Sequence, residues 1–176
     1  MTTKPEDRNI APARVVWITG FAGAGKTTLA RALQAKWFGP VVLLDGDALR
    51  EALGGADGHD RDARLHLAQS YGRLARLVSD SNVDVLVATI SMFHEVHAWN
   101  RAHIPAYTEI YLDASRALLH ERDQRGLYRA AKSSQVVGED LPAEVPQHPD
   151  IVFKVGEMAL DDMVSATLRY LRPGER

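Results

Sequence analysis

The segment "RVVWITGFAGAGKTT" (residues 14–28) combines a buried strand, a glycine-rich turn and the start of a helix, and the other elements can be placed around it. Residues 14–20 are mostly apolar and β-branched and end in glycine, which is typical of a buried strand. The part "GFAGAGKTT" (20–28) matches the pattern G-x-x-x-x-G-K-[ST] between a strand and a helix, the setting in which that pattern binds phosphate. The segment therefore predicts a phosphate-binding loop after the first strand.

The glycines of this loop allow backbone conformations in which successive N–H groups converge on phosphate oxygens, and the helix N-terminus favours an anion. Lys26 is expected to reach the β- and γ-phosphates, and the hydroxyl group of Thr27 is expected to bind Mg²⁺. Thr28 is expected to hydrogen-bond a phosphate or its own helix. The loop therefore predicts binding of a nucleoside triphosphate. The expected contacts are Gly20, Gly23, Ala24, Gly25, Lys26, Thr27 and Thr28.

Strand and helix patterns alternate along the rest of the chain. Further strands are predicted at 41–45, 83–90, 107–113 and 150–155, most of them apolar on both faces. Helices are predicted at 26–38, 61–81, 93–103, 115–123 and 159–171. This alternation predicts an α/β fold in three layers, with a mainly parallel sheet of five strands and with ligands at the carboxyl ends of the strands.

The composition limits the classes of partner. The 176 residues suffice for one domain with a sizeable core. The 21 basic and 23 acidic residues give no overall bias toward nucleic acid polymers or membranes, and the absence of cysteine excludes disulfides and thiol nucleophiles. No apolar run approaches a membrane span, and the first residues lack the apolar core of a secretory signal. We expect a cytoplasmic protein with a flexible tail (1–13) and a single domain (14–176).

The segment "LLDGDALR" (43–50) carries two carboxylates one residue apart, where a strand gives way to a helix. Asp45 ends the strand, and Asp47 begins the helix, for which it would be a good N-cap. Two carboxylates beside a triphosphate would repel it unless one acts through Mg²⁺ and the other faces an acceptor hydroxyl group. Arg50, one helical turn after Asp47, could hold a substrate phosphate. The pair of aspartates therefore favours phosphoryl transfer.

Other enzymes with this type of loop fit the sequence less well. A GTPase switch would need the guanine-reading sequence N-K-x-D, which is absent from this chain. A motor ATPase would normally need a longer chain. A kinase of small molecules is therefore the leading class.

Taken together, these residues resemble the adenylylsulfate kinase (APS kinase) family over about residues 14–155. The matching segments are "ITGFAGAGKTTLA", "LLDGDALR", "DARLHLAQSYGRLARLVSD", "VATIS", "ERDQRGLYRAA" and "VVGEDLPAEVPQHPDIV". The glycine loop alone is generic, whereas its combination with L-D-G-D, I-S and R-D-x-x-G-L-Y is specific. The resemblance implies a Mg²⁺-dependent kinase that uses ATP to phosphorylate the ribose 3′-hydroxyl group of adenylyl sulfate, and it makes a homodimer reasonable.

The resemblance also implies roles for individual residues. Asp47 would be the general base or would orient the hydroxyl group, Asp45 would be the carboxylate on the Mg²⁺ side, and Lys26 completes the catalytic set. Arg50 and Arg64 would clamp the anionic group of the substrate. Each of these arginines could instead be a solvated helix residue.

On the acceptor side, the resemblance implies that Ile90 and Ser91 contact the substrate at the end of the third strand. Arg125 matches a family lysine near the substrate, and Arg122 would lie over the donor nucleotide or be solvated. Both arginines belong to a lid at about 122–148, for which a surface insertion is the alternative.

The sequence departs from the family where an adenine base would bind. The family encloses this base between aromatic rings, and stacking contributes about 1–3 kcal/mol per base. His59 stands in the place of one aromatic residue, and the family's F-T-G is replaced by Val136, Val137 and Gly138. The loss of both rings indicates that the base or the 5′ substituent of the acceptor has changed.

A further departure is the segment "SMFHEVHAWNR" (91–101), which replaces the family's S-P-Y continuation. His94 and His97 have a spacing acceptable for a metal pair, but no cysteine or further ligand supports one. Trp99 could stack on a base or pack within its helix. These features resemble a divergent subgroup of the family associated with bacterial surface polysaccharides, one member of which phosphorylates cytidine diphosphoramidate.

The sequence leaves three functions to be tested. The first is a 3′-kinase of adenylyl sulfate, as in sulfate activation. The second keeps the chemistry and takes cytidine diphosphoramidate or a related pyrimidine nucleotide, which would fit a pocket without the two rings. The third is a nucleotide-binding module without catalysis, against which the intact Lys26, Asp45 and Asp47 argue because binding alone needs no positioned base.

Overall fold

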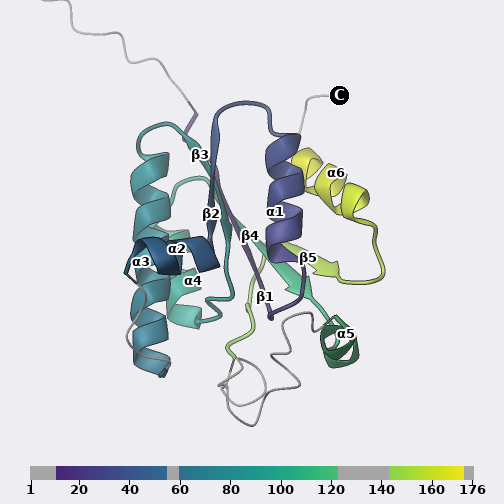
Figure 1. The fold of residues 1–176 in the computed structure, drawn as a ribbon. Helices are drawn as coiled ribbons and strands as arrows, with labels where there is room; N and C mark the ends of the chain where they lie inside the picture. Colours follow the sequence, from purple (N-terminus) through teal and green to yellow (C-terminus); the bar gives the residue numbers. More distant parts are fainter. Residues whose placement is uncertain (1–10, 55–59, 123–142, 173–176) are drawn as a thin grey trace, which may run out of the picture.

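The computed structural model describes residues 11–54, 60–122 and 143–172, in which strands and helices alternate as the sequence predicts (Figure 1). The strands are β1 (Val15–Gly20), β2 (Val41–Asp45), β3 (Asp84–Ala88), β4 (Tyr107–Asp113) and β5 (Ile151–Lys154). The helices are α1 (Lys26–Ala35), α2 (Gly46–Ala52), α3 (Arg61–Ser79), α4 (His94–His103), α5 (Arg116–Glu121) and α6 (Leu160–Leu171). None of the helices in the described ranges is long and apolar enough to cross a membrane.

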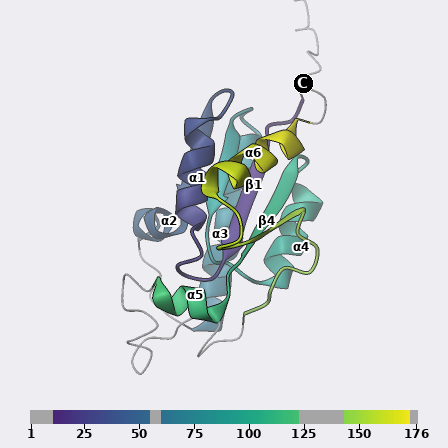
Figure 2. The same cartoon turned by 90° about the vertical axis from the view of Figure 1, so that its right-hand side faces the viewer.

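The five strands form one sheet in the order β2-β3-β1-β4-β5, and each neighbouring pair is parallel. Helices cover both faces, with α3 and α4 on one side and α1 and α6 on the other (Figures 1 and 2). The predicted three-layer α/β fold is therefore confirmed, and the sheet is parallel throughout the described chain rather than mainly so.

The central strand β1 supplies side chains to both layers of the core, and each of its residues is buried. Val16 and Ile18 pack with Leu29 of α1 and Val164 of α6. Alternate residues, Trp17 among them, pack on the opposite face with residues of α3 and α4. This arrangement explains the continuous apolar run of β1, because no face of the strand meets water. The edge strand β2 is only partly buried.

Three chain segments leave the sheet at the same level. Ala88 of β3 is paired with Ile18 of β1 on one side and with Asp45 of β2 on the other. The glycine loop follows β1, the two aspartates follow β2, and residues 89–91 follow β3. Because parallel strands share their carboxyl edge, this register places the three groups of predicted site residues together.

The last residue of β1 must be glycine. Gly20 has φ 148°, and a Cβ atom there would lie 2.7 Å from the carbonyl oxygen of Leu112 in the paired strand β4. Any side chain at this position would force the backbone of β1 away from β4, because the opposing atom belongs to the backbone and cannot rotate aside.

Gly20→Ala should therefore lower the free energy of unfolding by roughly 2–4 kcal/mol. This is the combined cost of a positive φ angle for a residue with a side chain and of an overpacked contact. Urea unfolding measures this difference. The matched control is Gly39→Ala, because a Cβ atom at Gly39 meets no atom within 4 Å. Equal unfolding midpoints for the two variants would contradict the close contact between β1 and β4.

Candidate active site

The glycine loop runs from the end of β1 to the first turn of α1. Gly23 (φ 79°) and Gly25 (φ 98°) have left-handed backbone conformations, and Gly25 is the N-cap residue of α1. The N–H group of Ala24 donates to the carbonyl group of Phe21 at 3.2 Å, which closes a turn within the loop. The backbone therefore reaches the N-terminus of α1 through a tight curve, the geometry in which N–H groups face an anion.

Lys26 is the first residue of α1, and its ammonium group lies against the loop. Its Nζ atom donates to the carbonyl oxygen of Phe21 at 2.8 Å. Burial lowers the pKa of Lys26 to about 8, against the opposite effect of the negative charges of Asp47 and Asp45. The ammonium group of Lys26 therefore lies near the loop and near two carboxylates. A bound phosphate would add negative charge and so favour the protonated form of the lysine.

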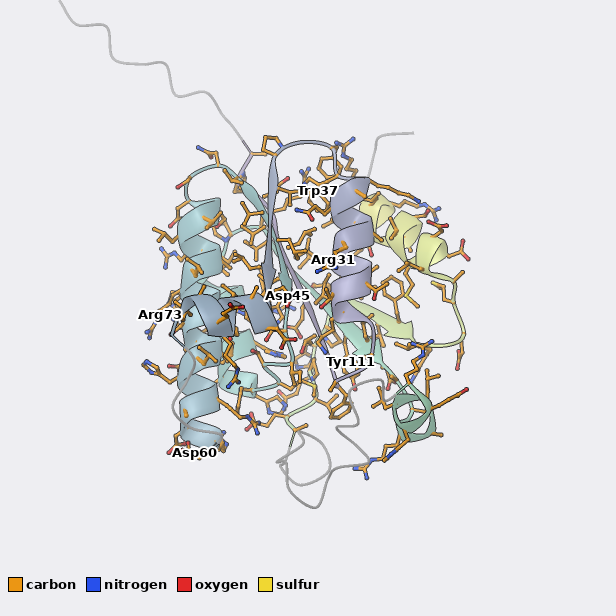
Figure 3. The ribbon with its side chains drawn as sticks, in the orientation of Figure 1. Arg31, Trp37, Asp45, Asp60, Arg73 and Tyr111 are labelled. Atoms are coloured by element: carbon orange, nitrogen blue, oxygen red, sulfur yellow. The ribbon has the colours of Figure 1, made fainter. Side chains whose placement is uncertain are left out.

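Asp45 links the glycine loop to the end of β2. The hydroxyl group of Thr27 donates to Oδ2 of Asp45 at 2.6 Å, and the N–H group of Asp47 donates to Oδ1 at 3.1 Å. In Figure 3, Asp45 lies between α1 and α2. A chain of hydrogen bonds therefore runs from the loop through Asp45 to the backbone of Asp47.

The cap of α2 differs from the structural alternative that the sequence suggested. The helix begins at Gly46, one residue before Asp47, and its N-cap residue is Asp45. The extended backbone of Asp45 (φ −85°, ψ 134°) directs its carboxylate to an N–H group of the first turn. Asp47 therefore lies inside the first turn of α2, and its side chain is exposed.

The Thr27 hydroxyl and the Asp45 carboxylate fit a Mg²⁺ ion. Mg²⁺ prefers oxygen ligands and is bound by one or two protein groups together with phosphate oxygens and waters. The described residues contain no group of three or more His, Asp or Glu side chains that could hold a metal by themselves. The Nε2 atoms of His94 and His97 contact backbone carbonyl groups, and their Nδ1 atoms face the carboxylates of Glu144 and Glu109.

Tyr71 of α3 fixes the turn between the two aspartates. Its hydroxyl group donates to the carbonyl group of Gly46 at 3.2 Å, and its side chain is buried. Burial is the main cause that raises the pKa of Tyr71, so the phenol remains a donor at neutral pH. The turn is therefore held by Thr27 of α1, through the Asp45 side chain, and by Tyr71 of α3.

Arg64 presents an unpaired donor beside a second arginine. Its Nη1 atom is buried and has no hydrogen-bond partner among the described residues, and its guanidinium group lies 5.8 Å from the ring centroid of Phe93. Burial first, and then the positive charges of Arg50 and Arg61, lower the pKa of Arg64. Buried donors and like charges of this kind are stabilised by an anion.

Arg61 and Glu144 form an ion pair next to Arg64 that the sequence did not predict. Nη2 of Arg61 donates to Oε1 of Glu144 at 2.8 Å, and Oε2 of Glu144 accepts from the N–H group of His94 at 2.7 Å. The hydrogen bond from Arg61 is the main cause that lowers the pKa of Glu144. Glu144 thus neutralises Arg61, although the two residues are 83 positions apart.

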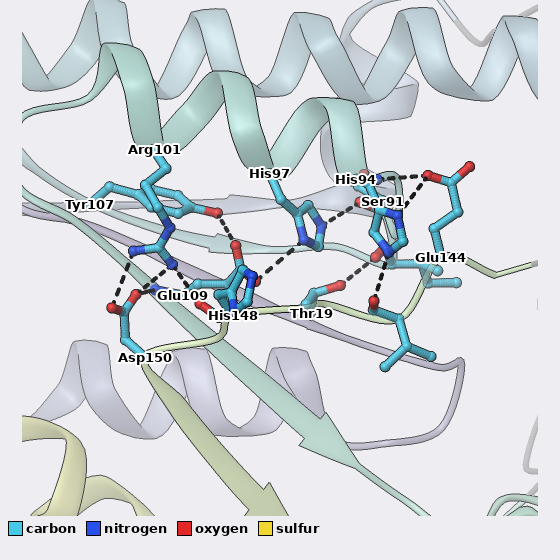
Figure 4. Close-up of polar contacts among 12 residues, drawn as sticks. Thr19, Ser91, His94, His97, Arg101, Tyr107, Glu109, Glu144, His148 and Asp150 are labelled. Carbon is cyan, nitrogen blue, oxygen red and sulfur yellow. Dashed lines mark hydrogen bonds and ion pairs between the residues drawn. The ribbon is translucent and has the colours of Figure 1, made fainter.

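The loop at residues 89–91 is held by side chains at three points, as Figure 4 shows in part. The Thr19 hydroxyl donates to the carbonyl group of Ile90. The hydroxyl groups of Thr89 and Ser91 lie 2.8 Å apart, and Nε2 of His97 lies 3.0 Å from the Ser91 carbonyl oxygen. The two predicted acceptor contacts, Ile90 and Ser91, therefore belong to a tightly fixed turn.

Two residues singled out in the sequence lie apart from this set. The ring of Trp99 stacks on that of His103 in the same helix at 4.5 Å between centroids, which favours packing within α4 over stacking on a base. Arg122 is the exposed C-cap residue of α5. Residues 123–142 of the predicted lid and five predicted contacts lie outside the described residues: His59, Arg125, Val136, Val137 and Gly138.

Comparisons with known proteins identify the family of the chain. The model of the adenylylsulphate kinase family matches residues 12–154. An adenylyl-sulfate kinase of Chloroflexus aurantiacus is 38% identical over 178 residues, with 97% of this chain and 94% of that protein covered. A cytidine diphosphoramidate kinase of Campylobacter jejuni is 35% identical over 163 residues, with 89% of this chain and 95% of that protein covered.

A solved structure extends the agreement to the fold. The structure of the Mycobacterium tuberculosis APS kinase in complex with AMPPNP and APS has a TM-score of 0.81 and 29% identity, and the match covers 92% of this chain and 99% of that one. The relatives carry both substrate names at similar identity, so they leave the acceptor open. Since the family model covers most of the sequence, the chain belongs to the adenylylsulfate kinase family of P-loop phosphotransferases with an alcohol group as acceptor.

Proposed function

We propose that the protein transfers the γ-phosphoryl group of ATP to the ribose 3′-hydroxyl group of a 5′-modified nucleotide. The hydrogen-bonded chain through Thr27, Asp45 and Asp47 carries this proposal, because it connects a phosphate loop to a carboxylate that can face an acceptor. A relative of the same fold that binds both AMPPNP and APS supports a site with two nucleotides.

On the donor side, the glycine loop and Lys26 would hold the β- and γ-phosphates. Thr27 and Asp45 would hold Mg²⁺, with the remaining positions filled by phosphate oxygens and waters. The ion would offset negative charge on the phosphates. The role of the chain on this side is therefore to position the triphosphate and to balance its charge.

On the acceptor side, Asp47 would orient the 3′-hydroxyl group for in-line attack. The 3′-oxygen forms a bond to the γ-phosphorus while the bond from that phosphorus to the β–γ bridging oxygen breaks, and the hydroxyl proton passes to Asp47. The exposed position of Asp47 in the first turn of α2 leaves its side chain accessible to a substrate. ADP and a 3′-phosphorylated nucleotide are the products.

Arg50 and Arg64 would bind the 5′ group of the acceptor. The Nη1 atom of Arg64, which is buried and has no hydrogen-bond partner in the described ranges, and the mutual repulsion of the arginines support an anion at this place. The sulfate of adenylyl sulfate and the phosphoramidate of cytidine diphosphoramidate both meet this requirement. The clamp therefore supports an acidic 5′ substituent without selecting the base.

Adenylyl sulfate is the acceptor that we propose first, because it is the acceptor of most named relatives. Cytidine diphosphoramidate is the second candidate. It is favoured by His59 and Val136 in the places of two aromatic residues and by the identity to the Campylobacter jejuni enzyme. The homodimer, the role of Arg122 over the donor nucleotide and the role of Arg125 near the acceptor remain part of the proposal.

Coupled ATP turnover with each acceptor in parallel tests the function. We expect acceptor-stimulated release of ADP with at least one of the two compounds and none with the Lys26→Ala control. Faster turnover with adenylyl sulfate would assign the protein to sulfate activation, and faster turnover with the cytidine compound would make the missing rings a specificity switch. ADP release unaffected by either compound would contradict both acceptors.

Asp47→Asn should lower kcat by roughly 10²–10⁴-fold, since the amide cannot accept the hydroxyl proton, while the affinity for ATP stays similar. Steady-state kinetics and ATP titration measure the two quantities. Glu51→Gln is the matched control, because Glu51 is an exposed carboxylate of the same helix. Unchanged turnover in Asp47→Asn would remove Asp47 from the mechanism.

The affinity for ATP should depend on pH through Lys26. Since the pKa of this lysine is about 8, its ammonium group is present below pH 8 and is lost as the pH rises above it. ATP affinity should therefore be constant below pH 8 and fall above it, by up to about tenfold per pH unit. Calorimetry in buffers of different ionisation enthalpy should detect proton uptake on binding at pH 9. A slope that persists in Lys26→Ala would assign the effect to another group.

A further inference from the structure

A buried carboxylate of β4 lies behind the predicted acceptor loop. The Glu109 side chain is only 2% exposed, and Oε2 accepts from the Tyr107 hydroxyl group at 2.9 Å. Oε1 lies 3.3 Å from Nδ1 of His97 in α4. A carboxylate removed from water needs such partners, and within the described chain its oxygens have a phenol and an imidazole beside them.

His97 connects this carboxylate to the acceptor loop. Its ring is 7% exposed and lies between Glu109 and Ser91, as Figure 4 shows. A backbone carbonyl oxygen can only accept, so the His97 Nε2 atom that faces Ser91 at 3.0 Å carries a hydrogen. The second ring nitrogen, Nδ1, lies within ion-pair distance of Glu109 and has no other polar partner among the described residues. Both contacts together fix the ring and aim its N–H group at Ser91.

Ser91 has a backbone conformation that needs such support. Its φ of 26° lies in the left-handed region, which is costly for a residue with a side chain. Its carbonyl oxygen accepts from His97 and from the N–H group of Phe93, and its hydroxyl group contacts Thr89. Strained residues of this kind persist only where their surroundings hold them.

The support behind Glu109 continues toward β5. Oδ2 of Asp150 accepts from the N–H group of Glu109 at 2.8 Å and from Arg101 at 2.9 Å. Burial and the charge of Glu109 raise the pKa of Tyr107 well above its usual value, which keeps the phenol a donor. Glu109 therefore lies in a fixed frame, from which His97 can hold the loop.

We infer that His97 is a positioning residue for the acceptor nucleotide: its hydrogen bond to the Ser91 carbonyl group holds residues 90–91 in the conformation that contacts the acceptor. This inference rests on the proposed function. His97 acts through Ser91, because its ring is buried and both of its nitrogens face protein oxygens. The glycine loop, where the proposed function places the donor nucleotide, takes no part in this hydrogen bond.

Two variants isolate the hydrogen bond to Ser91. Glu109→Gln removes the buried charge, while a neutral His97 can still donate to Ser91 through Nε2. The double variant His97→Phe with Glu109→Gln has the same charge state and a ring of similar size, but it has no donor. Comparison of these two proteins cancels the cost of changing the buried carboxylate. His103→Phe serves as a control on the same helix, since the contacts of that ring in the described chain, Nδ1 to the Trp99 carbonyl group and stacking on the Trp99 ring, stay within α4.

We expect the KM for the acceptor to rise about 3- to 10-fold from Glu109→Gln to the double variant, the scale of one hydrogen bond. The KM for ATP should stay unchanged, and His103→Phe should behave as the wild type. Replacing His97 by Gln in the Glu109→Gln background should restore part of the acceptor affinity, because its amide can donate to Ser91. Equal acceptor KM values, or parallel rises for ATP and acceptor, would overturn the inference.

Hydrogen exchange separates failure of this inference from failure of the proposed function. If the wild type uses neither acceptor, the proposed function falls, but the conformation of the loop can still be measured. Faster exchange at residues 89–93 in the double variant than in Glu109→Gln, with α1 unchanged, would support His97 as the residue that holds the loop. Equal exchange in the two proteins would overturn that role.

Discussion

The pairing of β3 between β1 and β2 is the constraint on which the candidate site depends. Because Ala88 is level with both Ile18 and Asp45, the chain leaves all three strands at one edge of the sheet. The hydrogen bond from Thr27 to Asp45 can form only because these exits are adjacent. A shift of one residue in either pairing would turn the side chains of that strand to the opposite face and separate the glycine loop from the aspartates.

Some of the charged side chains in the candidate site face opposite charges, whereas others face like charges. Lys26 lies near two aspartates beside the glycine loop, whereas Arg50 and Arg64 repel each other at the place proposed for the acceptor. The carboxylate of Glu144 accepts from Arg61 and from the first N–H group of α4, so both of its oxygens already have partners other than Arg64. Although the net charge of the protein is only −2, positive charge is therefore concentrated at the place proposed for the anionic group of the acceptor.

Local patterns in the sequence predicted the strands, the helices and the glycine loop, because apolar spacing and loop motifs act over a few residues. They also predicted that Asp45 and Asp47 lie together at the end of β2. They could not predict that Asp45 caps α2, since the choice depends on where the helix begins. Nor could they predict the contact of Arg61 with Glu144 or of His97 with Glu109, which depend on how distant segments pack.

The close approach of Gly20 to Leu112 also bears on motion. The residue that opens the glycine loop is packed directly against the backbone of β4, and its neighbours are bonded into the centre of the sheet. The start of the glycine loop is therefore as rigid as the core and provides a fixed surface for a bound ligand. Rearrangements during a catalytic cycle have to involve parts of the chain that are not hydrogen-bonded into the sheet.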